Sequence, residues 1–234
     1  MYRSRGFFPL EILPIRCQRR YNQSMRIPID RRVWPGVVVL LGMGGIGWFI
    51  SRDAGLLSLF LLACHLAFFR DPQRKIPAGE NPVSPADGQV AEVASVFEGR
   101  YLNEEAVKVG IFLSIFVPHV TRCPMGGRVR YLHYEPGKFL NALREDSVNH
   151  NESNWIGVEG DGRRVLFRQI AGAIARRIHC DVGLEDSVGR GGKVGIICYG
   201  SRLECFFPKR LFQSAIRVGE PVKAGETILG RWRA

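Results

Sequence analysis

The chain has 234 residues, a hydrophobic content of 46% and a formal net charge of +11. Its length allows one medium-sized domain, or a membrane segment followed by a compact domain. The hydrophobic content supports a real core and excludes wholesale disorder. The six cysteines are scattered, with no C-x-x-C pair and no spacing typical of metal ligands, so we expect a reducing compartment and no metal.

The positive charge is concentrated at the beginning of the chain. Residues 1–33 hold eight arginines and two acidic residues, for a formal charge of +6. Basic residues beside an apolar segment follow the positive-inside pattern and attract anionic lipid. A nucleic-acid-binding tail would need aromatic interleaving or a recognition motif, and we expect no nucleic-acid partner. We therefore interpret residues 1–32 as a basic N-terminal extension, although residues 1–24 also have the composition of an organellar transit peptide.

Two uncharged apolar runs follow, from Val33 to Ile50 and from Leu56 to Phe69. The first approaches the about 20 residues that a spanning helix needs, whereas the second is short. Glycines between positions 42 and 47 would weaken a water-soluble helix but allow close helix packing in lipid. A cleaved signal peptide fits poorly because the apolar run starts late. We expect residues 33–69 to form a membrane-associating helical hairpin, with a hairpin buried in a soluble core as the alternative.

From Arg70 onward the pattern changes to short β-type runs separated by polar turns. The runs are Gln89–Val96, Val107–Phe116, Arg128–Tyr134, Val165–Ile170, Lys193–Cys198, Leu203–Phe207 and Thr227–Arg231. The segment Gln169–Cys180 is ambiguous between helix and strand. Many short strands with polar turns favour a barrel or a sandwich.

Two segments of this region have similar patterns, VGLEDSVGRGGKVGII and IRVGEPVKAGETILGR. Their alternation of apolar residues and turns is that of the hairpins in lipoyl- and biotinyl-like barrel-sandwich domains, although the Met-Lys pair of those carriers is missing. We therefore predict a fold that is mainly β with some α. It consists of a compact barrel-sandwich domain over residues 70–234, preceded by the hydrophobic hairpin.

Three segments of the β region carry the residue types that chemistry needs. They are FFRDPQRKIPAGENPVSPADGQV (68–90), FLSIFVPHVTRCPMGGRV with YEPGKFLNA (112–142), and GIICYGSRLECFFP (195–208). In order and spacing they resemble the short bacterial form of the phosphatidylserine decarboxylase family, and the resemblance runs from about Met25 to the C-terminus. Family members usually begin at the position of Met25, so residues 1–24 are either an extension or a misassigned start.

The pair Gly200–Ser201 resembles the processing site of this family. A glycine before a serine leaves an unhindered carbonyl and a backbone that tolerates strain. The serine hydroxyl can attack that carbonyl, convert the amide to an ester and, after elimination and hydrolysis, leave a pyruvoyl group at residue 201. The resemblance therefore implies a large chain of residues 1–200 and a small chain of residues 201–234, with a covalent pyruvoyl cofactor that forms a Schiff base with the substrate amine.

Asp87 in SPADG and His119 in PHVTRCP match the catalytic aspartate and histidine of the family. Serine attack needs a base, and the product needs a proton donor. We expect Asp87 and His119 to share these tasks with Ser201. Two departures leave their division open: Val117 stands where relatives often have an acidic or amide residue, and Arg122 stands where longer members have a second histidine.

Arginine side chains are the candidates for binding the lipid phosphate through charge-assisted hydrogen bonds. We name Arg122, Arg176 and Arg177, and for the last two a solvated face is an equal alternative.

The resemblance implies an enzyme that converts phosphatidylserine to phosphatidylethanolamine and CO2 in phospholipid biosynthesis. The two chains of one precursor would form a heterodimer, and assembly into a homo-oligomer stays open. We expect attachment to the bacterial inner membrane with the catalytic domain on the cytoplasmic side. The alternatives are a decarboxylase of a related lipid such as an archaetidylserine, a noncatalytic membrane adaptor, and a serine hydrolase, which lacks the G-x-S-x-G elbow.

Overall fold

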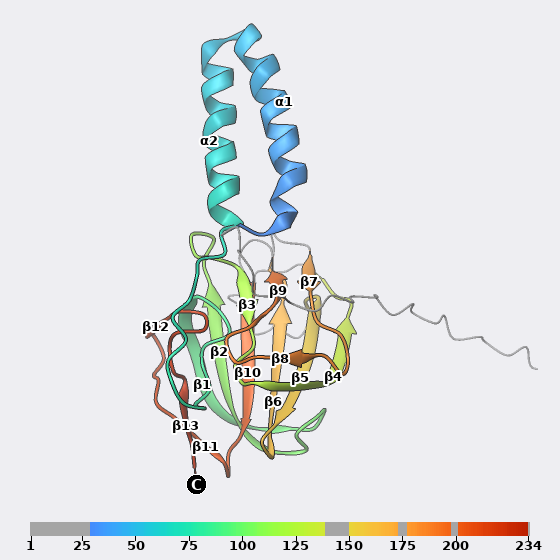
Figure 1. Ribbon diagram of the computed structural model, residues 1–234, viewed down its shortest axis with the longest axis vertical. Coiled ribbons are helices and arrows are strands. Elements are labelled where there is room, and N and C mark those ends of the chain that lie inside the picture. Colours follow the sequence, from blue (N-terminus) through green and yellow to red (C-terminus); the bar gives the residue numbers. More distant parts are fainter. Residues whose placement is uncertain (1–28, 139–149, 173–176, 198–200, 234) are drawn as a thin grey trace, which may run out of the picture.

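The computed structural model describes residues 29–138, 150–172, 177–197 and 201–233, and it has two parts (Figure 1). A helical hairpin projects from one end of a β domain, and the hairpin base lies next to the strands β3 and β9. The first 28 residues, which include most of the expected basic extension, lie outside the described part.

The hairpin consists of a 3-10 turn, Arg31–Val33, and two helices, α1 (Trp34–Ile50) and α2 (Arg52–Phe68). Ser51 separates the helices in extended conformation, and its hydroxyl accepts a hydrogen bond from the Ala54 amide at 3.1 Å. This is an N-cap, which satisfies one of the free amides at the start of α2.

Small residues let the two helices approach closely. A Cβ on Gly44 would lie 3.2 Å from the Ser58 hydroxyl, and that hydroxyl donates a 2.7 Å hydrogen bond to the Leu40 carbonyl. Residues 31–50 are long and apolar enough to cross a membrane, and only 17% of that window is buried. Phe49 is 93% exposed, so the structure does not support a hairpin buried in a soluble core. The apolar outer surface fits lipid.

The β domain confirms the expected fold class, a mainly β barrel-sandwich with a helical N-terminal part. Its strands are β1 (Gly88–Glu98), β2 (Glu104–Leu113), β3 (Val120–Arg122), β4 (Gly127–Glu135), β5 (Ser153–Gly160), β6 (Arg163–Ile170), β7 (Ile178–Cys180), β8 (Ser187–Val188), β9 (Lys193–Ile197), β10 (Ser201–Pro208), β11 (Phe212–Ser214), β12 (Pro221–Val222) and β13 (Gly230–Trp232). The large sheet has the order β12-β1-β2-β10-β6-β5-β4-β8, and β3-β9-β7 form a second sheet. Alternate side chains of these strands, such as Ile111, Phe167 and Leu203, fill the core between the sheets.

The two similar sequence segments occupy related places in this fold. They supply β8 and β12, the short strands at the two ends of the large sheet. Gly191 and Gly225 form their turns with φ of 71° and 75°, a conformation that favours glycine. A Cβ placed on Gly191 would lie 3.6 Å from the Gly225 Cα, so the two turns meet.

The strands differ from the expectation in several places, and the short strands β3 and β11 lie outside the predicted runs. The strand expected over 107–116 ends at Leu113, because the Val117 amide bonds to the Ser114 carbonyl at 3.2 Å and closes a turn. The run 227–231 contributes only its end to β13, and β5 was not expected at all. Most of β5 is buried on both faces, which removes the period-two alternation that identifies a strand.

Candidate active site

Two short connections bring the predicted site residues to the hairpin end of the domain. One connection leads from Leu113 at the end of β2 to His119, and the other leads from Ile197 at the end of β9 to Ser201. Ser201 pairs with Leu113, and the Ile197 amide donates to the His119 carbonyl at 3.2 Å. Both connections therefore run between the same two sheets, so His119 and Ser201 are brought to one end of the barrel. Gly200 lies outside the described residues.

Ser201 is the first residue of β10 and is fully buried. Its hydroxyl has no hydrogen-bond partner among the residues that the structure describes. Leaving a buried hydroxyl unpaired costs about 1–3 kcal/mol, so such a group needs an explanation. A hydroxyl that is not engaged in a structural bond is available as a nucleophile.

His119 is also fully buried, directly before β3. Its Nδ1 lies 2.8 Å from the Val117 carbonyl oxygen, and the Phe68 ring packs 4.4 Å from its ring centroid. A carbonyl oxygen only accepts, so Nδ1 carries the proton and Nε2 carries the lone pair of the neutral ring. Burial, together with the charge of Arg70, lowers the pKa of His119 to about 4, although the bond to Val117 opposes the shift. The imidazole is therefore a neutral base at physiological pH.

Asp87 lies just before β1 at the same end of the domain, 6% exposed. Gln89 pairs with Phe112 on the opposite side of β2 from β10, which places Asp87 and Ser201 about two strand spacings, roughly 10 Å, apart. The Asp87 carboxylate binds Arg74 Nη2 at 2.6 Å. Burial raises the pKa of Asp87, while Arg74, Arg122 and the Ala224 amide oppose the shift.

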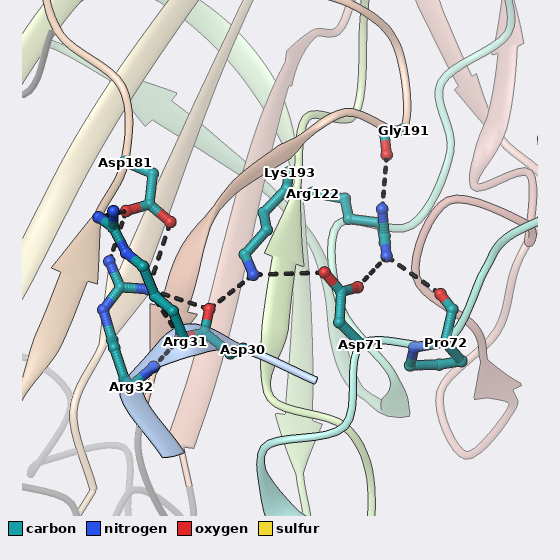
Figure 2. Close-up of polar contacts among 9 residues, drawn as sticks. All are labelled: Asp30, Arg31, Arg32, Asp71, Pro72, Arg122, Asp181, Gly191 and Lys193. Carbon is teal, nitrogen blue, oxygen red and sulfur yellow. Dashed lines mark hydrogen bonds and ion pairs between the residues drawn. The ribbon is translucent and has the colours of Figure 1, made fainter. Parts of the chain in front are cut away.

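Arg122 is buried and its guanidinium is engaged within the protein (Figure 2). It bonds to the Asp71 carboxylate, and to the carbonyls of Pro72 and Gly191 at 3.2 Å each. Its amide also donates to the Pro85 carbonyl at 2.8 Å, next to the SPADG segment. The position of the second family histidine is thus occupied by a residue that connects Asp71 to β3, the strand that follows His119.

Arg122 belongs to a chain of alternating charges that we call the polar clamp. Its members are Asp30, Arg32, Asp71, Arg122, Asp181 and Lys193 (Figure 2). Lys193 Nζ lies 2.6 Å from Asp30 and 3.3 Å from Asp71, and thereby joins the two ends of the hairpin to β9. Burial disfavours the charge of Asp30, but the bonds from Lys193 and the Arg32 amide outweigh it and lower the pKa of Asp30. The clamp fixes the hairpin base against the strands that lead to the site.

Of the two other arginine candidates, the structure describes Arg177. Ile178 pairs with Ile197, so the exposed Arg177 precedes β7 at the level where β9 ends. Arg176 lies outside the described residues. Arg177 is therefore exposed beside the end of β9 and open to an anionic ligand, whereas Arg122 already binds a carboxylate.

Sequence reasoning missed the partners of the predicted residues. Arg74 pairs with Asp87, Asp71 pairs with Arg122, and Phe68 packs on His119. All three belong to the segment FFRDPQR, which the resemblance included. Their charges and ring could have been noted as candidates, but the pairing depends on contacts about 13 to 51 residues apart in sequence, which no local pattern reveals.

Comparison with known proteins is consistent with this geometry. The family described as phosphatidylserine decarboxylase matches residues 61–230, a range that contains Asp87, His119 and Ser201. A protein named phosphatidylserine decarboxylase proenzyme from Carboxydothermus hydrogenoformans is 42% identical over 197 residues, which cover 84% of this chain and 90% of the relative. Proteins of the same name from Syntrophus aciditrophicus and Symbiobacterium thermophilum are 47% and 39% identical, over 70% and 89% of this chain and 77% and 98% of their own lengths.

Proposed function

The chain belongs to the phosphatidylserine decarboxylase family, and from this we propose that it converts phosphatidylserine to phosphatidylethanolamine and CO2. The observation that supports this function is the buried Ser201 hydroxyl, unpaired among the described residues, at the end of the domain that also holds the neutral His119. The relatives are named proenzymes, which agrees with a chain that must be processed before it acts.

Self-cleavage begins at the Ser201 hydroxyl. We propose that His119 Nε2 accepts the hydroxyl proton while the oxygen bonds to the Gly200 carbonyl carbon. The C–N bond then breaks, the freed amine takes a proton, and an ester joins the two parts of the chain. Elimination leaves a carboxylate on Gly200 and a dehydroalanine at residue 201, and addition of water with loss of ammonia produces the pyruvoyl group.

The surroundings of residue 201 fit a pyruvoyl group. The position is fully buried, and removal of the serine oxygen breaks no hydrogen bond to the residues that the structure describes. When formed, the group supplies an electrophilic carbonyl that accepts the electron pair released with CO2. The role of the surrounding residues is to exclude water and to hold a proton.

His119 and Asp87 are the proposed proton carriers. His119 Nε2 is unprotonated at neutral pH and can take up a proton and return it to the product. Burial raises the pKa of Asp87, which brings this carboxyl closer to the range in which it exchanges protons. Arg74 holds the carboxyl at 2.6 Å and so fixes its position.

The phosphate of the lipid substrate has Arg177 as its proposed partner, with Arg176 beside it in sequence. Arg177 is exposed next to the end of β9, where a headgroup could approach residue 201 from the lipid. Arg122 stays a weaker candidate, because Asp71 already satisfies its charge.

The membrane assignment rests on the hairpin. An apolar helix with little burial and a lipid-metabolising family indicate membrane association. We propose the bacterial inner membrane, with residues 70–234 as the catalytic domain on the cytoplasmic side, because the arginine-rich beginning of the chain favours that side. The large and small chains would stay together, since β10 of the small chain pairs with β2 and β6 of the large chain.

The test is release of CO2 from phosphatidylserine labelled in the serine carboxyl. The full chain should release CO2 from mixed vesicles, and the Ser201→Ala protein should release none above background. Ser214→Ala, a change to a half-buried hydroxyl in β11, is the matched control and should keep activity within about twofold of the wild type. Equal activity of the Ser201→Ala protein and the control would overturn the proposal.

A further inference from the structure

The connection between β2 and β3 exposes large apolar side chains at the hairpin end of the domain. Ile115 is 46% exposed and Phe116 is 79% exposed. We call residues 114–117 the apolar loop; in Figure 1 it is the light-green connection beside the base of α2. An exposed phenylalanine next to an isoleucine is costly in water unless something covers them.

The apolar loop is tied to the base of the hairpin. Arg70, two residues after the end of α2, donates one hydrogen bond to the Ala67 carbonyl and a second to the Phe116 carbonyl, both at 2.6 Å. A single guanidinium therefore joins the end of α2 to the loop. These bonds hold the loop level with the end of α2.

The neighbouring surface indicates which partner covers the loop. The hairpin helices expose apolar side chains up to their bases, including Trp34 at 57%. Exposed arginines lie at the same end of the domain: the Arg31 side chain is 67% exposed, and Arg177 is exposed as well. An apolar loop beside an apolar hairpin, at an end of the domain that also carries exposed arginines, fits the headgroup region of a bilayer, where apolar side chains are buried and cations meet anionic lipid.

We propose that the apolar loop inserts into the bilayer beside the hairpin and forms the side from which the lipid substrate enters. The entry role rests on the proposed decarboxylase function, whereas the insertion does not. The loop begins one residue after Leu113, the strand partner of Ser201, and ends with Val117, whose carbonyl accepts the Nδ1–H of His119. Insertion therefore brings the serine headgroup of a lipid next to both residues.

The chain supplies a matched control for Phe116. Phe97 is 67% exposed and lies near the end of β1, where it pairs with Glu105. Along β2, Glu105 is about 27 Å from Leu113, at about 3.4 Å per residue. Phe97 is thus the same residue type with similar exposure at the opposite end of the domain.

Fluorescence quenching tests the insertion directly. Phe116→Cys and Phe97→Cys are introduced into the full chain with every native cysteine except the buried Cys123 and Cys205 replaced by alanine, labelled with an environment-sensitive dye and reconstituted into vesicles of phosphatidylcholine and phosphatidylglycerol. We expect lipid-borne nitroxide to quench the dye at position 116 and aqueous iodide to quench the dye at position 97. Equal quenching by iodide at both positions would overturn the proposal.

Kinetics with two forms of substrate test the entry role. Phe116→Ser should raise the half-saturating surface concentration of phosphatidylserine in vesicles by roughly tenfold, because the loss of an inserted phenyl ring weakens lipid contact. It should leave turnover of a dispersed short-chain phosphatidylserine unchanged, and Phe97→Ser should change neither. Identical vesicle kinetics of the Phe116→Ser and Phe97→Ser proteins would contradict the entry role.

The two experiments separate this inference from the proposed function. A wild-type protein that releases no CO2 from either substrate would refute the decarboxylase activity, and the quenching result would still decide whether the loop inserts. A protein that decarboxylates both substrates but keeps position 116 in water would refute the insertion alone.

Discussion

The polar clamp and the Ser201 site both contain buried polar side chains at the same end of the domain, but these side chains differ in their bonding partners. In the clamp, the Lys193 ammonium binds the Asp30 carboxylate at 2.6 Å and the Asp71 carboxylate at 3.3 Å. At the site, the Ser201 hydroxyl lacks a partner among the described residues and burial keeps His119 neutral. A buried charge is tolerated when a counter-charge pairs with it. A buried polar group without a partner lowers the stability of the fold, and the rest of the structure must offset that cost. We therefore expect the clamp to stabilise the fold and the Ser201 site to carry the proposed chemistry.

Removal of the base at the site should have the largest effect. His119→Gln keeps a polar side chain of similar size but removes the proton acceptor, so self-cleavage should slow by about 10²–10⁴-fold. The measurement is the time course of precursor cleavage on a denaturing gel. His133→Gln, at a half-exposed histidine on β4, is the control and should cleave at the wild-type rate. Equal rates for the His119 and His133 variants would remove His119 from the mechanism.

Breaking the clamp should lower the free energy of unfolding and affect the cleavage rate much less. Asp71→Asn leaves Lys193 and Arg122 without one of their counter-charges, and loss of one partner of a buried pair costs about 3–5 kcal/mol. Thermal unfolding in detergent should show a clear decrease in Tm. Glu80→Gln breaks an ion pair to Arg163 in which the Glu80 side chain is 70% exposed, and it should cost less than about 1 kcal/mol. A Tm of the Asp71→Asn protein equal to that of the Glu80→Gln protein would contradict a structural role for the clamp.

A change of pH should have a smaller effect on stability and on the cleavage rate, and the direction of each effect can be predicted. The pKa of His119 is lowered from 6.5 to about 4. As the pH falls from 6.5 to 4, the histidine is therefore protonated in the unfolded chain but stays neutral in the native protein. The native state should thereby lose up to about 3 kcal/mol between pH 6.5 and 4, and little of it above pH 6.5. Self-cleavage should stay constant from pH 8 to about 5 and fall near 4, where His119 becomes protonated.

The control for this prediction is the His119→Gln protein. Asp87 acts in the opposite direction, since its raised pKa favours the native state as the pH falls. The difference in unfolding free energy between wild type and His119→Gln isolates the histidine. A cleavage midpoint near pH 6.5 would show that His119 titrates as an exposed histidine and would contradict its burial.

The sequence predicted the hairpin, the fold class and the segments that meet at the site, because each depends on local pattern or on resemblance. Runs such as Leu203–Phe207 contain enough residues of strand type to identify β10, and the lack of charge over Val33–Ile50 identifies α1. Local pattern failed for β5, whose two buried faces hide the alternation. It also failed for the end of β2, which a single turn hydrogen bond decides.

The arrangement inside the site was less predictable. The sequence places Asp87, His119 and Arg122 in segments that the family shares, but it does not say that Arg74 binds Asp87 or that Asp71 and Lys193 surround Arg122. Such pairings depend on tertiary geometry, and the charge of a residue alone does not choose among several candidate partners. The roles given to Asp87, His119 and the arginines stay predictions.

The central claim is that the chain cuts itself between Gly200 and Ser201 and converts residue 201 to a pyruvoyl group. The most direct measurement is the intact mass of the purified, membrane-extracted protein under denaturing conditions. The claim predicts two chains, residues 1–200 and 201–234, with the small chain lighter by the mass of ammonia than the same peptide with an N-terminal serine. A single chain of 26.3 kDa in a preparation that decarboxylates phosphatidylserine would contradict it.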